Sequence, residues 1–153
     1  MSEVRLWQQC KVVLDKASVY AERLTDKLKT GIPDSFFVQN GVTHWMELKV
    51  IEWVTDAIDI RADQIATLYR LHRNGAPTWL LVRDTKGKRL FLFGGINTGG
   101  RLKPTIPFAQ WNKLKDSAFL FTANEAGNPH LKVFASTAQA VSHVLLQRDQ
   151  HEF

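Results

Sequence analysis

Two acids and a lysine near residue 40 carry the strongest chemical signal in this sequence. Asp34 opens one short apolar run, and Glu47 and Lys49 close a second one. Asn40 and Gly41 stand between the two runs, and an Asn-Gly pair in this setting predicts a two-residue β-hairpin turn, because both turn positions need a positive φ. With the loop at these two residues, the register of the hairpin places Asp34 directly opposite Glu47.

Two opposed carboxylates need a compensating partner. Side chains directly opposite each other in an antiparallel pair have Cβ atoms about 4.5–5.5 Å apart, and like charges at that distance destabilise a sheet. A Mg²⁺ ion is commonly held by one or two carboxylates together with a substrate phosphate. Lys49 follows Glu47 by two residues and therefore points to the same face of the strand. The pattern indicates a site for a cation, a phosphate and an attacking water; a coincidental surface pair is the alternative.

Composition places the chain among ordinary globular proteins. Its 153 residues suit a single domain spanning 1–153, and its hydrophobic fraction of 44% is typical of such domains. The one cysteine, Cys10, excludes an intrachain disulfide. The start of the chain does not resemble a signal peptide, and no apolar run approaches the roughly 20 residues of a membrane span, so we expect a soluble, cytoplasmic protein. The net charge of +5 suits a polyanionic partner such as nucleic acid.

Apolar periodicity predicts helices that alternate with strands, which is typical of the α/β class. The first helix is expected to bury Val4, Trp7, Cys10 and Val13. Both faces of the hairpin carry apolar side chains, so the sheet should be covered on both sides. The helices are expected at 3–16, 61–74, 106–115 and 137–148. The strands are expected at 18–24, 34–39, 42–50, 78–83, 89–93, 118–122 and 131–135.

Pro33-Asp34, twelve further residues, and then Glu47-Leu48-Lys49 spell the pattern PD-(D/E)xK. This resembles the signature of the PD-(D/E)xK nuclease superfamily. The context of GIPD, HWMELKV, a helix bearing Gln64, and the strand TWLLV after Gly75 is similar to the virus-type replication-repair nuclease (VRR-NUC) and phage Holliday-junction-resolvase branch. The similarity covers about residues 18–84, roughly half of the chain.

The resemblance implies a restriction-endonuclease-like fold, with a mixed central β-sheet flanked by helices on both faces. It implies that Lys49 orients or activates water and that Gln64 positions Lys49 or the substrate. It also implies a cofactor, Mg²⁺, for which Mn²⁺ can substitute. The implied metal ligands are Asp34, Glu47, the carbonyl of Leu48, and the upstream Glu22. Resolvases commonly carry their additional Glu on the first helix, whereas this first helix offers Glu3 and then Gln8-Gln9.

Basic residues in two predicted loops are candidates for DNA binding: Lys86, Lys88 and Arg89 in one, and Arg101 and Lys103 in the other. Ordinary exposed charge is the alternative explanation for both. The Gly-rich stretch at 94–104 lacks the GK[ST] ending of a P-loop, so no nucleotide cofactor is expected. Trp45 and Trp53 flank the motif, and core packing is favoured over base stacking for both.

The leading hypothesis is a Mg²⁺-dependent endodeoxyribonuclease that hydrolyses DNA phosphodiester bonds. The resemblance adds branched or junction DNA, phage-type replication and recombination, the host cytoplasm if the protein is phage-encoded, and a homodimer that cuts two opposed strands. The rival hypothesis is a catalytically inactive nuclease-fold module that binds DNA or another protein. A third hypothesis, a chance motif in a small globular domain, predicts that Asp34 and Glu47 lie far apart.

Overall fold

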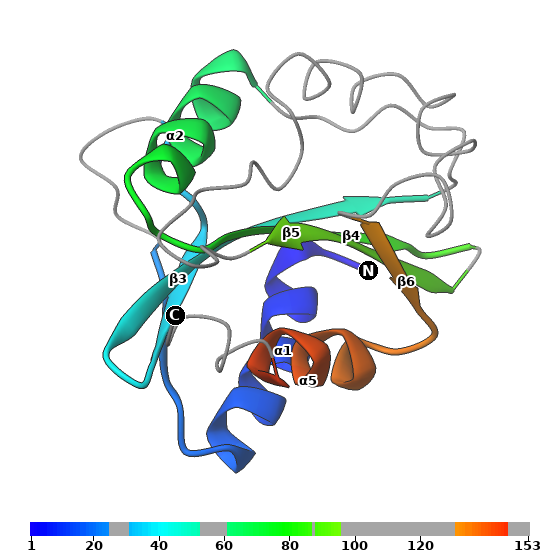
Figure 1. Cartoon of the computed structure of the whole chain (residues 1–153). Helices are drawn as coiled ribbons and strands as arrows, with labels where there is room; N and C mark the ends of the chain where they lie inside the picture. Colours follow the sequence, from blue (N-terminus) through cyan, green and yellow to red (C-terminus); the bar gives the residue numbers. More distant parts are fainter. Residues whose placement is uncertain (25–30, 53–60, 87, 96–130, 147–153) are drawn as a thin grey trace.

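A computed structural model describes residues 1–24, 31–52, 61–86, 88–95 and 131–146 (Figure 1). The expected helix at 106–115, the expected strand at 118–122, Trp53, Arg101 and Lys103 lie outside these ranges. The described elements are α1 (Glu3–Lys16), β1 (Tyr20–Arg23), β2 (Ser35–Gln39), β3 (Val42–Ile51), α2 (Ala62–Arg73), β4 (Thr78–Asp84), β5 (Arg89–Gly95), β6 (Leu131–Phe134) and α5 (Thr137–Leu146).

The strands form one six-stranded sheet in the order β1-β2-β3-β4-β5-β6. Among the described strands, β3 and β4 pair in parallel and the other neighbours pair antiparallel. Parallel neighbours need a crossover connection, and α2 lies in the chain between β3 and β4. The sheet is therefore mixed, which confirms the predicted fold class.

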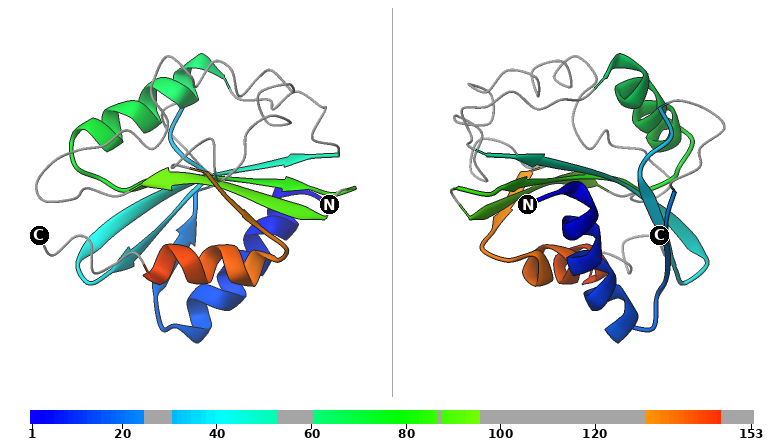
Figure 2. Two further views of the ribbon diagram at one scale, coloured as in Figure 1. Left: turned by 45° about the vertical axis from the view of Figure 1, so that its right-hand side comes forward. Right: turned by 180° about the vertical axis from the view of Figure 1, so that it is seen from behind.

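Helices lie on both faces of the sheet, as predicted. Figures 1 and 2 show α1 and α5 together on one face and α2 on the other. The main hydrophobic core lies between the sheet and the α1/α5 pair, and it includes Leu6, Phe37, Met46, Leu48 and Leu81. None of the helices in the described part of the chain is both long enough and apolar enough to cross a membrane.

The buried face of α1 differs from the predicted one. Trp7 and Cys10 are buried as expected, but the other buried positions are Leu6 and Leu14. Val4 is 46% exposed, and Val13 is only partly buried against the core. Leu6, Cys10 and Leu14 follow each other at four-residue spacing, so one stripe of the helix carries both leucines into the core. The larger leucine side chains remove more apolar surface from water than the valines would.

The hairpin has the predicted register. Asn40 has a φ of 52° and Gly41 a φ of 75°, as a two-residue turn of this type requires. From that turn the ladder runs from Gln39 opposite Val42 to Ser35 opposite Met46. Asp34 directly precedes β2, and Glu47 is the next residue on β3. The two acids are therefore neighbours in the fold, which contradicts the hypothesis of a chance motif.

Burial raises the pKa of the Cys10 thiol from 9.0 to about 12. The thiolate is the reactive form, so we expect the folded protein to resist alkylation by iodoacetamide at pH 8. In denaturant the same cysteine should react fully within minutes, as followed by mass spectrometry. Rapid modification of the folded protein would show that α1 separates readily from the sheet.

Candidate active site

Strand β3 carries two charged side chains on the face that α2 covers. Glu47 and Lys49 alternate with the core residues Met46 and Leu48, because successive side chains on a strand point to opposite faces. Glu47 is fully buried, and Lys49 is 8% exposed. Charged groups are almost never buried to this degree unless they are paired. The opposite charges on these neighbouring positions provide that pairing.

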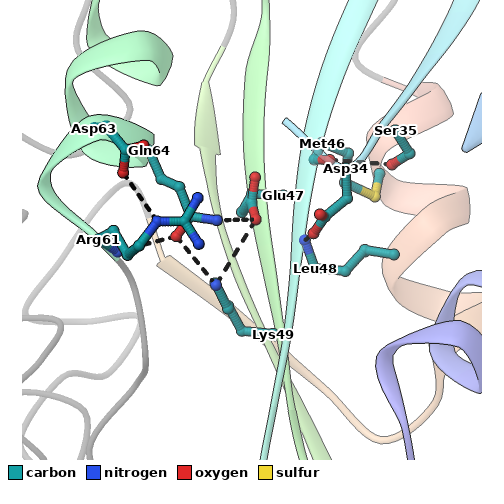
Figure 3. A network of polar contacts seen from close by, with 9 residues as sticks. All are labelled: Asp34, Ser35, Met46, Glu47, Leu48, Lys49, Arg61, Asp63 and Gln64. Carbon is teal, nitrogen blue, oxygen red and sulfur yellow. Dashed lines mark hydrogen bonds and ion pairs between the residues drawn. The ribbon is translucent and has the colours of Figure 1, made fainter. Parts of the chain in front are cut away.

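Gln64 from α2 links the two charges (Figure 3). Its Nε2 donates a hydrogen bond to Glu47 Oε1 at 3.1 Å, and its Oε1 accepts one from Lys49 Nζ at 3.2 Å. The Lys49 Nζ lies 3.8 Å from Glu47 Oε1. The expected contact between Gln64 and Lys49 is therefore present. The Gln64 amide can have only this orientation here, because its NH₂ group must face the carboxylate and its oxygen must face the ammonium group.

The start of α2 holds Gln64 in this orientation. Gln64 is the third residue of the helix, and its Oε1 also accepts a hydrogen bond from the backbone N–H of Arg61 at 2.9 Å. Asp63 accepts hydrogen bonds from the Gln64 backbone N–H and from the Arg61 side chain. The first N–H groups of a helix have no partner within the helix, so these side chains satisfy them. The helix start thus serves both its own capping and the site.

Asp34 approaches β3 from β2, immediately beyond the end of the hairpin ladder. Its Oδ2 accepts a hydrogen bond from the backbone N–H of Leu48 at 3.1 Å, and its carbonyl accepts one from Leu24 at 2.7 Å. Ser35 is the residue of β2 farthest from the turn, and its hydroxyl group donates a hydrogen bond to the Met46 carbonyl. Figure 3 shows Glu47 on the side of β3 nearer α2, and Asp34 on the side nearer Ser35.

Pro33 explains why the ladder ends here. Continuing the register by two residues places Pro33 opposite Leu48. Proline has no N–H, so it cannot donate a hydrogen bond to the Leu48 carbonyl. The Asp34 carboxylate instead takes the N–H of Leu48. The Pro-Asp pair therefore stops backbone pairing and places a carboxylate beside the backbone of Leu48.

These donors fit a magnesium site with few protein ligands. Asp34, Glu47 and the Leu48 carbonyl supply hard oxygens from adjacent strands, and Mg²⁺ usually completes its shell with water and phosphate. Among the described residues, no three His, Cys, Asp or Glu side chains form a group that could hold a metal. Glu22 is exposed on β1, opposite Phe36 and not beside Asp34. Its role as a ligand stays a prediction.

The three candidate DNA-binding residues in the described part of the chain lie around the turn after β4. Lys86 is half-exposed, and its Nζ lies 3.6 Å from the Glu52 carboxylate. Arg89 is bonded to the buried Asp84 at 3.3 Å and stacks over Phe91. Lys88 is exposed. These cations remain available to a polyanion, but two of them already have partners within the protein.

Two features of the site differ from the sequence prediction or add to it. The first is Gly31, whose φ is 85° and whose Cα faces the start of α2 so closely that an added Cβ would lie 2.7 Å from the Asp63 carbonyl oxygen. The glycine of GIPD was the available signal. The second is Trp45, expected in the core but only half-buried on the face that carries Glu47. Strand parity places Trp45 on the face of Glu47, as the sequence predicted, and only its partial exposure was not expected.

Comparison with protein-family profiles gives no match, and neither does comparison with curated protein sequences. Among solved structures, the chain is similar to Hjc, a Holliday junction resolvase from Archaeoglobus fulgidus, an archaeal hyperthermophile. The similarity has a TM-score of 0.47 and 19% sequence identity, and it covers 60% of this chain and 75% of the other.

Gly31→Ala should disturb the site through α2. The added methyl group meets backbone and a strained φ, so we expect a loss of about 2–3 kcal/mol in the free energy of unfolding, measured by urea denaturation. Gly41→Ala is the matched control, because its φ is also positive but nothing lies within 4 Å of the added Cβ. Gly41→Ala should lower the free energy of unfolding by only about 1 kcal/mol. Equal losses would show that Gly31 does not position the helix.

Proposed function

We propose that this protein is a metal-dependent nuclease of the PD-(D/E)xK type that hydrolyses DNA phosphodiester bonds. The single observation that carries the proposal is the buried contact of Lys49 with Glu47 and Gln64, with Asp34 bound to the backbone N–H of Leu48, the residue between Glu47 and Lys49. A buried lysine and two neighbouring carboxylates are costly for a purely structural site, because each charge must be desolvated.

Charge balance supports a bound divalent cation. Asp34, Glu47 and Lys49 together carry one net negative charge, which would repel the negative charge of a phosphodiester. A bound Mg²⁺ reverses the sign of the site and so attracts the phosphate. Asp34, Glu47 and the Leu48 carbonyl would hold the ion, which would supply charge neutralisation on the phosphate and activation of water near neutral pH.

The chain's own residues have distinct parts in this chemistry. Lys49 offers N–H donors and a positive charge to a phosphate oxygen or to the attacking water. Gln64 restricts Lys49 by accepting one of its hydrogen bonds, so the ammonium stays on the side of Glu47. Pre-positioned charges in a site with little water stabilise a transition state without first having to reorganise.

A second candidate is a nuclease-fold protein that binds nucleic acid or another protein without cutting. One observation favours it: both carboxylates already accept hydrogen bonds within the protein, Asp34 from Leu48 and Glu47 from Gln64. A metal would have to compete with these bonds. Calorimetric titration with Mg²⁺ and Mn²⁺ separates the two candidates, because the binding module needs no metal affinity.

Asp34→Asn and Lys49→Met should each lower the rate of DNA cleavage about a hundredfold or more, because each removes a charge at the reacting phosphate. The measurement is single-turnover cleavage of a labelled substrate with Mg²⁺ or Mn²⁺. Methionine keeps most of the apolar stem of Lys49, and Glu47 keeps its hydrogen bond from Gln64, but Glu47 loses its ion-pair partner. The thermal unfolding midpoint is therefore measured for each variant, and cleavage is compared at a temperature at which both variants are folded.

Asp15→Asn and Lys11→Met are the matched controls. They make the same chemical changes in an exposed ion pair on α1, on the other face of the sheet. Both should cut at the rate of the unsubstituted protein. Cleavage that survives the Asp34 and Lys49 substitutions, or that needs no divalent cation, would rule out the proposed site.

The finer proposal is selectivity for branched or junction DNA. A panel of linear duplex, flap and four-way junction substrates with equal numbers of phosphates should show faster cleavage of the branched forms. The solution mass, measured in the same buffer, tests the homodimer that paired cuts in two opposed strands would require. Equal rates on all substrates would leave a nuclease without this selectivity.

A further inference from the structure

Three aromatic rings form a row on the face of the sheet that carries Glu47 and Lys49. Phe36 and Trp45 are direct cross-strand partners on β2 and β3, with ring centroids 5.6 Å apart. Tyr20 on β1 extends the row, with its ring centroid 6.1 Å from that of Phe36. The inner two rings are half-buried, and Tyr20 is 62% exposed.

The row is continuous with the candidate active site. Trp45 comes two residues before Glu47, and Phe36 comes two residues after Asp34. Two residues along a strand span about 7 Å, roughly one nucleotide step of an extended nucleic-acid strand. A strand with one phosphate at Glu47 and Lys49 would therefore bring its neighbouring nucleotide to the rings.

Sheet stability accounts for part of this row but not for its outer ring. A cross-strand aromatic pair such as Phe36 and Trp45 stabilises a hairpin by itself. Tyr20 lies at the edge strand with most of its side chain in water, where it adds little to the core. Tyrosine is enriched at binding surfaces, because its ring offers an apolar face and its hydroxyl group stays in water. Here the ring extends a row of neighbouring aromatic rings.

The local charge favours bases over phosphates at the rings. Glu22 is exposed on β1 on the same face, in register with Phe36 and Trp45. Its carboxylate repels the phosphate backbone but can accept hydrogen bonds from the amino groups of bases. Flat base faces are accessible only when the nucleotides are unpaired, because bases inside a duplex are stacked on each other.

We propose that Tyr20, Phe36 and Trp45 form a stacking surface for unpaired bases beside the reacting phosphate. The preferred substrate then carries single-stranded nucleotides on one side of the cut, as flaps, forks and opened junctions do. The position of the cut rests on the proposed nuclease function. Base stacking itself requires no cleavage, so it can be measured without metal.

The test compares Tyr20→Ala with Tyr20→Phe in the full-length protein, in EDTA. The probes are a fluorescein-labelled single strand of about 12 nucleotides, within the usual site size, and a hairpin duplex with the same number of phosphates. Loss of the ring should weaken single-strand binding about tenfold, the effect expected for one stacked base. Duplex binding should stay within about twofold, because phosphate contacts dominate it.

Two control variants guard against misreading, and a third variant tests the inner ring. Tyr20→Phe keeps the ring and should bind like the unsubstituted protein. Val12→Ala removes an exposed apolar side chain from α1, on the other face, and should also have no effect. Trp45→Leu tests the inner ring, with its thermal unfolding midpoint measured alongside. It should weaken single-strand binding while the protein remains folded at the assay temperature.

Several outcomes would overturn the stacking surface. The first is a single-strand affinity of Tyr20→Ala within twofold of that of the unsubstituted protein. The second is an equal loss of affinity for the single strand and the duplex in Tyr20→Ala. The third is that the unsubstituted protein shows no measurable single-strand binding. A fourth is a dimer that dissociates in Tyr20→Ala while single-strand binding is unchanged, since the row would then be a contact between copies. Single-strand binding that depends on Tyr20 in a protein that cuts nothing would support the surface and reject the nuclease.

Discussion

The buried ion pair of Glu47 and Lys49, linked by Gln64, is the interaction on which the arrangement of the site depends. Neither charge could remain away from water without the other, because desolvation of an isolated ion is costly. Gln64 adds the hydrogen bonds that complete the pair, and it comes from α2, the crossover helix that follows the hairpin in the chain. The start of α2 must therefore lie over β3, which gives the crossover helix one defined position on the sheet.

Strand β3 joins the two halves of the sheet and separates two environments. It pairs antiparallel with β2 and parallel with β4. Met46 and Leu48 point into the core beneath α1 and α5, while Glu47 and Lys49 point towards α2. A slip of one residue in register would send the charges into the core and the apolar side chains into the site. The stability of the core thus enforces the geometry of the polar face.

Much of this arrangement followed from local sequence signals. The Asn40-Gly41 turn determined the hairpin register, and parity then placed Lys49 on the face of Glu47. Local residue types also mark two helix ends: Ser2 accepts a hydrogen bond from the Arg5 N–H at the start of α1, and Gly75 has a positive φ after α2. The packing face of α1 was predicted wrongly, because its two leucines decide which stripe is buried against the sheet. The partial exposure of Trp45 was also not predicted, since apolar character alone does not show which parts of a covered sheet remain accessible to solvent.

Two kinds of interaction therefore determine the hairpin of β2 and β3 and the polar site beside it. The sequence alone determined its turn, its register and the alternation of its side chains, because these depend on neighbouring residues and on the geometry of a strand. The resemblance anticipated the contact of Gln64 with Lys49. Only the tertiary structure decided that Gln64 also bonds Glu47, that Asp34 accepts a hydrogen bond from the Leu48 N–H, and that Glu22 lies opposite Phe36. Those contacts join segments whose relative positions result from the packing of the whole sheet and its helices. Such packing cannot be derived from the pattern of neighbouring residues.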